Sequence, residues 1–430
     1  MNAKYFFLIV AIAAITVCST NAQSTYSVWD GKTTQALAAP KGNVYEIRSA
    51  SQLAALAKDT SQTAGKTYIL KTNIDLAGHD WQPIGVGPDP VPLDEIGTAG
   101  PAIDPVEKLF CGSFDGGGFT IKGLKLPDAK YSGLFGYIRG VSQKQKSVIK
   151  NLQVELFDSI VTATKLECAG VLAGNAIDVA ISNISVAGNM HIKATQSVSV
   201  GGISGLLSRG SISVSASNID LTVETVDGNA HAGGIAGLNS GIISSCYSTG
   251  NIKAEPIYYA YAGGIAAYNH NADGYAKITS CYAAGDITAA SRQSWSHAGG
   301  IVGMMDEGTT VENCAALNKN VIATAPNGKP FAGRIAGLES QGTYKNNVAN
   351  FDMLVKQNEN QTKDFITNTR HGVGVKLAAL TGPSSATIYV RAGTLKANTN
   401  GAITSGGLSW DPKVWDFTEG RLPKLKWQVK

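Results

Sequence analysis

The chain has 430 residues, of which 16% are charged and 49 are glycines, and its formal net charge is +4. So few helix-forming Glu and Lys residues exclude long surface helices, and so small a charge without a basic stripe excludes electrostatic binding to nucleic acid. The length fits one large domain or two to three ordinary ones.

The N-terminus has the three parts of an export signal. Lys4 supplies a positive charge, Tyr5–Val17 is apolar, and small residues lie just before a cut after Ala22. This pattern predicts a signal peptide over residues 1–22, cleaved after Ala22, and an exported protein, either secreted or on the outer cell surface. The alternative is a lipoprotein anchored through Cys18, but Val17 lies where such proteins normally have a small residue. No later apolar run is long enough to cross a bilayer, so no transmembrane segment is expected in the mature chain.

The segment after the leader is expected to cover the N-terminal end of the fold. Open ends of stacked β-structure need protection, so we predict an N-terminal cap over residues 23–67. Within it, Ser49–Thr60 opens with a serine and spaces its leucines for one short helix.

One glycine-rich pattern recurs seven times in the following region. Its copies are SGLFG, AGVLAG, VGGISG, AGGIAG, AGGIAA, AGGIVG and AGRIAG, with starts 30 to 38 residues apart. A period of this size with strand-like content indicates a solenoid, whereas helical repeats need a 3.6-residue periodicity that the sequence lacks. We therefore predict an all-β fold, a single-stranded parallel β-helix (β-solenoid) over residues 68–355 that we expect to be right-handed. A β-rich C-terminal cap is predicted over residues 356–430, in which residues 358–407 have no assigned role.

The most regular feature of the repeat is an aliphatic residue two places after its start. Because parallel strands in adjacent coils lie ~4.8 Å apart, equivalent positions should stack and form an apolar core ladder. Glycine beside it allows the tight bends that each coil needs. At a later corner, Gly188, Gly250 and Gly285 are each followed by Asn or Asp, which we expect in the left-handed conformation. The predicted core ladder consists of Leu134, Leu172, Ile203, Ile235, Ile265, Ile301 and Ile335.

Three cysteines occupy one place in consecutive repeats, in SSCYSTG, TSCYAAG and ENCAAL. We predict that Cys246, Cys281 and Cys314 form a buried ladder of free thiols that fills small spaces in the core. A disulfide between adjacent coils is the alternative. The odd number of cysteines after the leader and the lack of a CxxC spacing argue against a zinc site and a dense disulfide scaffold, so no metal or other cofactor is predicted.

Gly233–Ile252, with the sequence GGIAGLNSGIISSCYSTGNI, resembles the GLUG repeat. Tyr68–Gly85 and Phe110–Leu126 resemble the opening coils of that family, Asn346–Met353 its closing coil and Trp415–Trp427 its C-terminal tail. The resemblance implies a bacterial β-solenoid in an extracellular setting, as in exported surface proteins, adhesin-like proteins and non-catalytic regions of IgA-cleaving peptidases. Those peptidases carry a zinc-binding His-Glu-x-x-His on a helix, and this chain has no such motif.

A carbohydrate-active enzyme is a second class of function, because polysaccharide lyases and hydrolases also use parallel β-helices. Such a site would need clustered carboxylates with an Arg or Lys base nearby. The carboxylates of the repeat do not line up, except that Asp286 shares its position with asparagines and is interpreted as a turn residue. Asp115 in FDGGG is interpreted as part of a tight turn, and Asp75 in NIDLAG as a carboxylate that caps backbone amides.

The best candidate for binding is a set of side chains in two adjacent loops. Counted back from the first glycine of the motif, Tyr259 and Trp295 occupy one position in successive coils. Aromatic rings one coil apart can form a flat platform for sugar rings, with Arg292 or His297 supplying hydrogen bonds. A purely structural aromatic ladder at the solenoid edge is the competing interpretation. The candidate ligand-binding residues are Tyr258, Tyr259, Arg292, Trp295 and His297.

The sequence therefore favours a non-catalytic extracellular or cell-surface protein that serves adhesion or binds glycans or host proteins. The first alternative is a polysaccharide lyase or hydrolase on the same kind of fold. The second is a structural spacer in an envelope assembly, which would have a stable protein partner and no soluble ligand.

Overall fold

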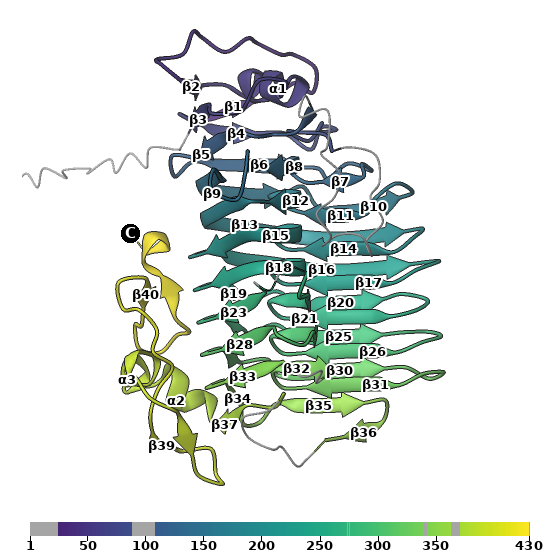
Figure 1. The fold of residues 1–430 in the computed structure, drawn as a ribbon, viewed down its shortest axis with the longest axis vertical. Coiled ribbons are helices and arrows are strands. Elements are labelled where there is room, and N and C mark those ends of the chain that lie inside the picture. The colour runs from purple at the N-terminus through teal and green to yellow at the C-terminus, as the bar shows by residue number, and fades with distance from the viewer. Residues whose placement is uncertain are drawn as a thin grey trace, which may run out of the picture.

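The chain winds into a stack of parallel coils. The computed structural model describes residues 25–87, 108–272, 274, 276–338, 342–362 and 370–429, and the predicted leader with Cys18 lies outside them. Within these residues the strands form one sheet of 30 strands, one of seven and two of two (Figure 1). Nearly all pairings among the described strands are parallel, and the antiparallel strand pairs in this part of the chain lie near the C-terminus. The predicted all-β parallel solenoid is confirmed.

Successive coils each contribute one strand to the seven-stranded sheet. Its register places residues from the same position of the repeat opposite each other. His231 thus pairs with Tyr261, and Tyr261 pairs in turn with His297. The strands are β7 (Tyr131–Ser132), β11 (Cys168–Gly170), β14 (Val198–Gly201), β17 (Ala230–Gly233), β21 (Ala260–Gly263), β26 (Ser296–Gly299) and β31 (Pro330–Gly333).

The wall of the solenoid bends sharply after these strands, at the repeated glycines. A side chain at Gly299 would overlap the carbonyl group of Val302, and a Cβ at Gly303 would lie 2.9 Å from the carbonyl oxygen of Ala262. The strands on the two sides of the bend therefore press closely against each other. Glycine is used here because it allows the backbones to approach without a side chain between them.

The aliphatic residues that follow the bend lie in the hydrophobic core. Leu134, Leu172, Ile203, Ile235, Ile265, Ile301 and Ile335 are all 0% exposed. The stack continues through their backbones, since the amides of Ile235 and Ile265 each donate to the equivalent carbonyl of the next coil at 2.8 Å. The strands beyond the bend are β8 (Phe135–Arg139), β12 (Ala173–Ile177), β15 (Ser204–Ser213), β18 (Ala236–Ser244), β22 (Ala266–Asn269), β27 (Val302–Met305) and β32 (Ala336–Leu338).

A second bend in the coils is built from residues in the left-handed conformation. Asn183, Ser245, Ser280, Asn313 and Asn346 have φ angles of 51° to 54°. Asparagine adopts this conformation more readily than most residues because its short polar side chain can bond locally. The sequence signal of this corner is therefore spread over asparagine and serine, which makes it weaker than the glycine motif.

The three aligned cysteines follow directly after left-handed residues of this corner. Cys246, Cys281 and Cys314 are free thiols and are 0% exposed. Burial raises the pKa of the Cys281 and Cys314 thiols well above the ordinary value. A thiol that stays protonated is a poor nucleophile, so these side chains act as core packing.

The corner that follows the later glycines differs from our expectation. Asn189, Asn251 and Asp286 do not have positive φ, so the prediction of a left-handed conformation there was wrong. The side-chain oxygens of Asn251 and Asp286 instead accept backbone amides of the next coil. The Asp286 amide donates to Asn251 Oδ1 (2.9 Å), and the Asn320 amide donates to Asp286 Oδ1 (3.1 Å). These bonds join equivalent positions of successive coils and so help to keep the coils in register.

The N-terminal segment covers one end of the stack, at the top of Figure 1. Helix α1 (Ala50–Lys58) begins after Ser49, whose side chain accepts a hydrogen bond from the Gln52 amide at 3.3 Å. The strands β1 (Tyr26–Val28) and β2 (Val44–Ile47) lie beside it. The predicted short helix is confirmed, and the described part of the chain contains no helix with the length and apolarity needed to cross a membrane.

The C-terminal segment runs along the flank of the solenoid (Figure 1). The indole of Trp410 donates to the Asn313 carbonyl at 2.7 Å, and that of Trp427 donates to the Val214 carbonyl at 3.0 Å. Both acceptors are residues of the left-handed corner. The segment is thus attached to the same edge of several coils. Its elements are α2 (Leu377–Thr381), α3 (Ser385–Val390), β38 (Lys396–Ala397), β39 (Ile403–Ser405), β40 (Trp415–Asp416) and β41 (Lys424–Leu425).

The last copy of the glycine motif carries Arg334 where the four preceding coils have glycine. In the preceding coil, a side chain at Gly300 would meet the carbonyl of Arg334, so glycine is needed there. Arg334 instead extends over the end of the stack, where Nε donates to the His371 carbonyl (2.9 Å) and a terminal nitrogen donates to the Gly372 carbonyl (2.8 Å). The arginine in AGRIAG therefore marks the coil at which the repeat ends.

Candidate ligand-binding site

Four ring side chains stack on the outer face of the seven-stranded sheet, one from each successive coil. The ring centroids of His231 and Tyr261 are 4.6 Å apart, and their planes differ by 2°. His297 follows Tyr261 at 5.0 Å, and Phe331 follows His297 at 5.2 Å. We call these four residues the aromatic ladder. Ala230 and Ala232 belong to the hydrophobic core, and side chains alternate along a strand, so His231 between them and the rest of the ladder lie on the opposite side of the wall from the core isoleucines.

Tyr259 and Trp295, which we call the rim pair, continue the ladder towards solvent. They are 37% and 38% exposed, and Tyr258 beside them is 42% exposed. The two rings are 6.2 Å apart at 69°, so they meet edge to face and do not form the single flat platform that we expected. Each ring instead stacks with the ladder ring of its own coil, Tyr259 with Tyr261 (6.2 Å) and Trp295 with His297 (6.4 Å).

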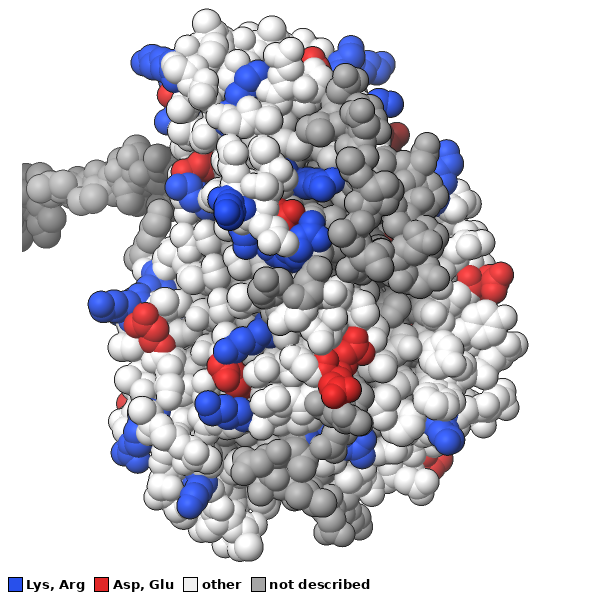
Figure 2. All heavy atoms as spheres, in the orientation of Figure 1, with Lys and Arg blue, Asp and Glu red and all other residues white. Residues whose placement is uncertain are grey.

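Positive side chains lie near the rim pair but take different roles. Lys329 Nζ is 5.4 Å from the centre of the Trp295 ring, within the range of a cation–π interaction. Arg292 is one of the cations that lower the pKa of Glu224. Burial alone would raise that pKa, but a hydrogen bond from His191 and the nearby positive charges outweigh the effect of burial. On the face shown in Figure 2, charges of both signs are interspersed among wide uncharged areas.

The two imidazoles of the ladder are buried without full hydrogen bonding. His297 is 1% exposed, and among the described residues neither of its ring nitrogens has a hydrogen-bond partner. Nδ1 of His231 is equally without a partner within that part of the chain. Burial lowers the pKa of both side chains to about 4, so they are neutral at pH 7. The ring of His297, which stacks with that of Trp295, therefore carries buried nitrogens without hydrogen bonds. A buried polar group of this kind lowers the folding stability by about 1–3 kcal/mol.

We expect the protein to lose stability as the pH falls from about 6.5 to about 4. His231, His297 and His371 have pKa values of about 4 in the fold against an ordinary 6.5, so only the unfolded chain binds protons in this window. The stability is therefore complete above pH 6.5 and falls towards pH 4. Denaturant unfolding at a series of pH values would measure the loss of unfolding free energy. The variant His297→Phe, which has the residue found as Phe331 in the next coil, should make this loss smaller by up to about 3 kcal/mol.

The exposed His79 provides the control for this measurement. His79→Phe should leave the pH dependence unchanged. Equal curves for His297→Phe and the unmodified protein would show that the buried imidazole does not cause the acid sensitivity.

A polar cluster lies across the bend from the ladder and was not predicted from the sequence. Tyr268 Oη donates to Asp306 Oδ1, and His270 Nδ1 pairs with Asp306 Oδ2, both at 2.6 Å. Tyr268 also stacks on Tyr261 of the ladder, with centroids 5.9 Å apart and planes 10° apart. One signal could have revealed it, since His270 and Asp306 each lie seven residues after the first glycine of their motif.

Asp306 holds the imidazole of this cluster in one orientation. Burial alone would raise the pKa of Asp306, but hydrogen bonds from His270 and Tyr268 hold it below its ordinary value. A carboxylate on Nδ1 directs Nε2 of His270 away from the cluster, where it can bond to another group. The described ranges contain no group of three His, Cys, Asp or Glu side chains that could hold a metal ion. Fixed aromatic faces with a few polar groups are an arrangement suited to binding.

The carboxylates that we considered as catalytic candidates hold backbone turns. Asp115 Oδ1 accepts the Gly117 amide at 2.9 Å, and Asp75 Oδ1 accepts the Ala77 amide at 2.8 Å. These contacts confirm the interpretation of both residues as turn-forming. Both carboxylates also lie beside a lysine, Lys150 and Lys122 respectively, which balances their charge.

Comparison with known proteins identifies the fold. Neither the models of known protein families nor the curated proteins give a match. Among solved structures, the chain is similar to a protein of Bacteroides ovatus that is provisionally named an immunoglobulin A1 protease, with a TM-score of 0.53 and 19% sequence identity. The similarity covers 89% of this chain and 92% of that one.

Proposed function

We propose that the protein is a non-catalytic, exported β-solenoid that captures glycans with the rim pair. The observation that carries this proposal is the pair of partly exposed rings, Tyr259 and Trp295, held at the end of a stacked ladder. Sugar rings pack on aromatic faces, and a scaffold that fixes those faces in advance lowers the entropy cost of binding. Tyr258 beside the pair and Lys329, whose Nζ lies 5.4 Å from the Trp295 ring, are polar groups that could complete such a site.

Membership of the GLUG-repeat proteins and a surface or secreted location belong to the same proposal. The signal-peptide pattern at the N-terminus and the repeat sequence support both. The name of the similar B. ovatus protein raises proteolysis of immunoglobulin A1 as a further possibility. The lack of a His-Glu-x-x-His motif in this chain favours an adhesive role over that one.

The double variant Tyr259→Ala/Trp295→Ala is expected to bind immobilised oligosaccharides at least about tenfold more weakly than the unmodified protein. Each ring contributes on the order of 1 kcal/mol through its face, and 1.4 kcal/mol corresponds to a factor of ten. Retention on a panel of neutral and acidic glycans would measure the change. Unchanged retention would exclude the rim pair as the binding site.

Phe157 provides a matched control, because it is an exposed aromatic residue (47%) far from the rim pair in sequence. Phe157→Ala should retain the glycans that bind to the unmodified protein.

The same incubations also separate the classes of function. Reducing or unsaturated sugar ends formed above a heat-treated control would favour a carbohydrate-active enzyme, while a protein partner in cross-linking without any retained glycan would favour the structural spacer.

A further inference from the structure

One position of the repeat places four residues in a row that includes the rim pair. Asn229, Tyr259, Trp295 and Lys329 each lie four residues before the first glycine of their motif. The carbonyl groups of Tyr259, Trp295 and Lys329 accept backbone amides of the preceding coil at 3.0 to 3.1 Å. The loops that carry them lie one above another along one side of the stack, at the right of Figure 1. The row therefore runs along the solenoid axis, with ~4.8 Å between its members.

Lys329, at the C-terminal end of the row, is an exposed cation. Its Nζ lies 5.4 Å from the centre of the Trp295 ring, and within the described part of the chain its side chain forms no ion pair. Contact with a ring does not neutralise the charge, and at an exposed site it is weaker than a charge-assisted hydrogen bond. The ammonium group can therefore leave the ring for an anion that binds beside Trp295.

The loops of the rim contain two cations and no acidic residue. These loops are residues 256–259, 291–295 and 325–329, and their charged residues are Arg292 and Lys329. Asp227 lies three coils from Lys329, about 14 Å at the spacing of paired strands, which exceeds the ~8 Å over which exposed charges act at physiological ionic strength. Glu359, in the next coil, forms no ion pair with Lys329. Because Arg292 acts on Glu224, Lys329 is the cation of the rim that is left for a ligand.

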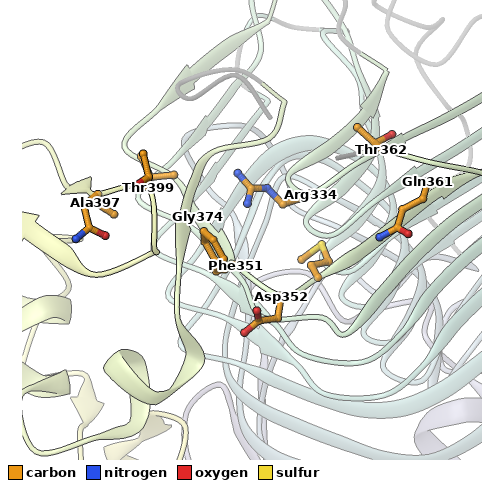
Figure 3. Close-up of a pocket in the computed structure, with 11 residues that line it drawn as sticks. Arg334, Phe351, Asp352, Gln361, Thr362, Gly374, Ala397 and Thr399 are labelled. Atoms are coloured by element: carbon orange, nitrogen blue, oxygen red, sulfur yellow. The ribbon is translucent and has the colours of Figure 1, made fainter. Parts of the chain in front are cut away.

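A cavity of about 630 Å³ lies where the last coil meets the C-terminal segment, but it offers no such cation (Figure 3). Arg334 lines it from the last coil and Thr399 from the C-terminal segment. The guanidinium of Arg334 already bonds to two backbone carbonyls. Asp352 belongs to the same lining, so the described residues around this cavity have no net charge. The rim is therefore the better place for an anionic ligand.

We propose that the rim pair binds a linear glycan that carries an anionic group, a carboxylate or a sulfate, and that this group bonds to Lys329. The inference rests on the proposed function, since the sugar rings pack on Tyr259 and Trp295. An extended glycan advances by roughly one coil spacing per sugar unit, so neighbouring units meet neighbouring coils. At the other end of the row, the Tyr259 amide donates to Asn229 Oδ1 at 3.1 Å, which leaves the NH₂ group of Asn229 to donate to a hydroxyl group.

Titration calorimetry of the full mature chain would test the proposal with matched pairs of ligands. Trimers of galacturonate, mannuronate and guluronate are each compared with their methyl esters, which keep the rings and hydroxyl groups but lack the charge. A sulfated galactose trimer is compared with its unsulfated form, which separates sulfate from carboxylate. The charged member of at least one pair is expected to bind at least about tenfold more tightly than its uncharged match, because it gains a charge-assisted hydrogen bond.

The variant Lys329→Met tests the assignment of the cation. It should remove the preference for the charged ligand and leave the binding of the uncharged form unchanged. Lys165, an exposed lysine in the loop before β11, provides the matched control, so Lys165→Met should bind both forms as the unmodified protein does. A preference that survives in Lys329→Met would overturn the assignment to this residue.

The double variant Tyr259→Ala/Trp295→Ala distinguishes failure of this inference from failure of the proposed function. Equal binding of charged and uncharged forms, lost in the double variant, would overturn the anionic ligand and leave glycan capture by the rim pair intact. Binding that the double variant keeps would overturn both. The same conclusion would follow if the unmodified protein bound none of these trimers.

Discussion

Replacing Ile265 with alanine is expected to lower the free energy of unfolding by about 2–5 kcal/mol. The side chain is 0% exposed, and its backbone is bonded at 2.8 Å to both neighbouring coils. The stacked coils cannot close the space left by the missing carbons, because moving one coil would break the register of the next. Denaturant unfolding followed by circular dichroism would measure the loss.

Ile242 provides the matched control, since it is an isoleucine in the preceding coil with 40% exposure. Ile242→Ala should cost no more than about 1 kcal/mol. In a solenoid each coil contacts only its neighbours, so the Ile265 variant should lose hydrogen-exchange protection first in β21 and β22 and in the coils beside them. A uniform loss along the chain would contradict the picture of locally stabilised coils.

Replacing Trp410 with alanine is expected to cost about 3–5 kcal/mol, mainly in the attachment of the C-terminal segment. Trp410 is 1% exposed, and its ring centroid lies 4.7 Å from those of both Trp415 and Tyr389. Its indole nitrogen also donates to the Asn313 carbonyl of the solenoid at 2.7 Å. The change therefore removes packing within the segment and one of its bonds to the coils.

The expected observation is release of the segment while the coils stay folded. Limited proteolysis should cut the Trp410→Ala variant within residues 376–429 at a denaturant concentration that leaves the unmodified chain intact. Trp295→Ala, at a tryptophan that is 38% exposed, is the control and should resist cleavage. Simultaneous loss of the segment and the coils would mean that the two parts unfold as one unit.

The repeat made the solenoid and its core predictable from the sequence. Stacking requires the same type of residue at the same position of each repeat. The recurring Ile235, Ile265 and Ile301 therefore identified the core from the sequence. The rim pair was found by the same counting. Counting could not give the 69° angle between its two rings, because that angle depends on the different lengths of the two loops.

The remaining features depend on contacts that no repeat encodes. The left-handed corner was misplaced because asparagine occurs at two corners, and only one of them, with Asn313 and Asn346, requires positive φ. His270 and Asp306 share one offset in adjacent coils, directly after the paired strands β22 and β27, but they are different residue types, so no recurring residue marked their contact. The cavity at Arg334 joins the last coil to a segment that contains no copy of the motif, so its lining had no sequence pattern to follow.

The exchange of glycine for arginine at position 334 bears on how such a chain could have evolved. Every coil that ends in Gly-Gly presents a surface on which an identical coil can dock, so duplication of one repeat unit in the gene would lengthen the cylinder without altering its ends. Arg334 occupies that surface in the final unit. Related genes are therefore expected to differ in whole multiples of about one period, inserted before the arginine and never after it.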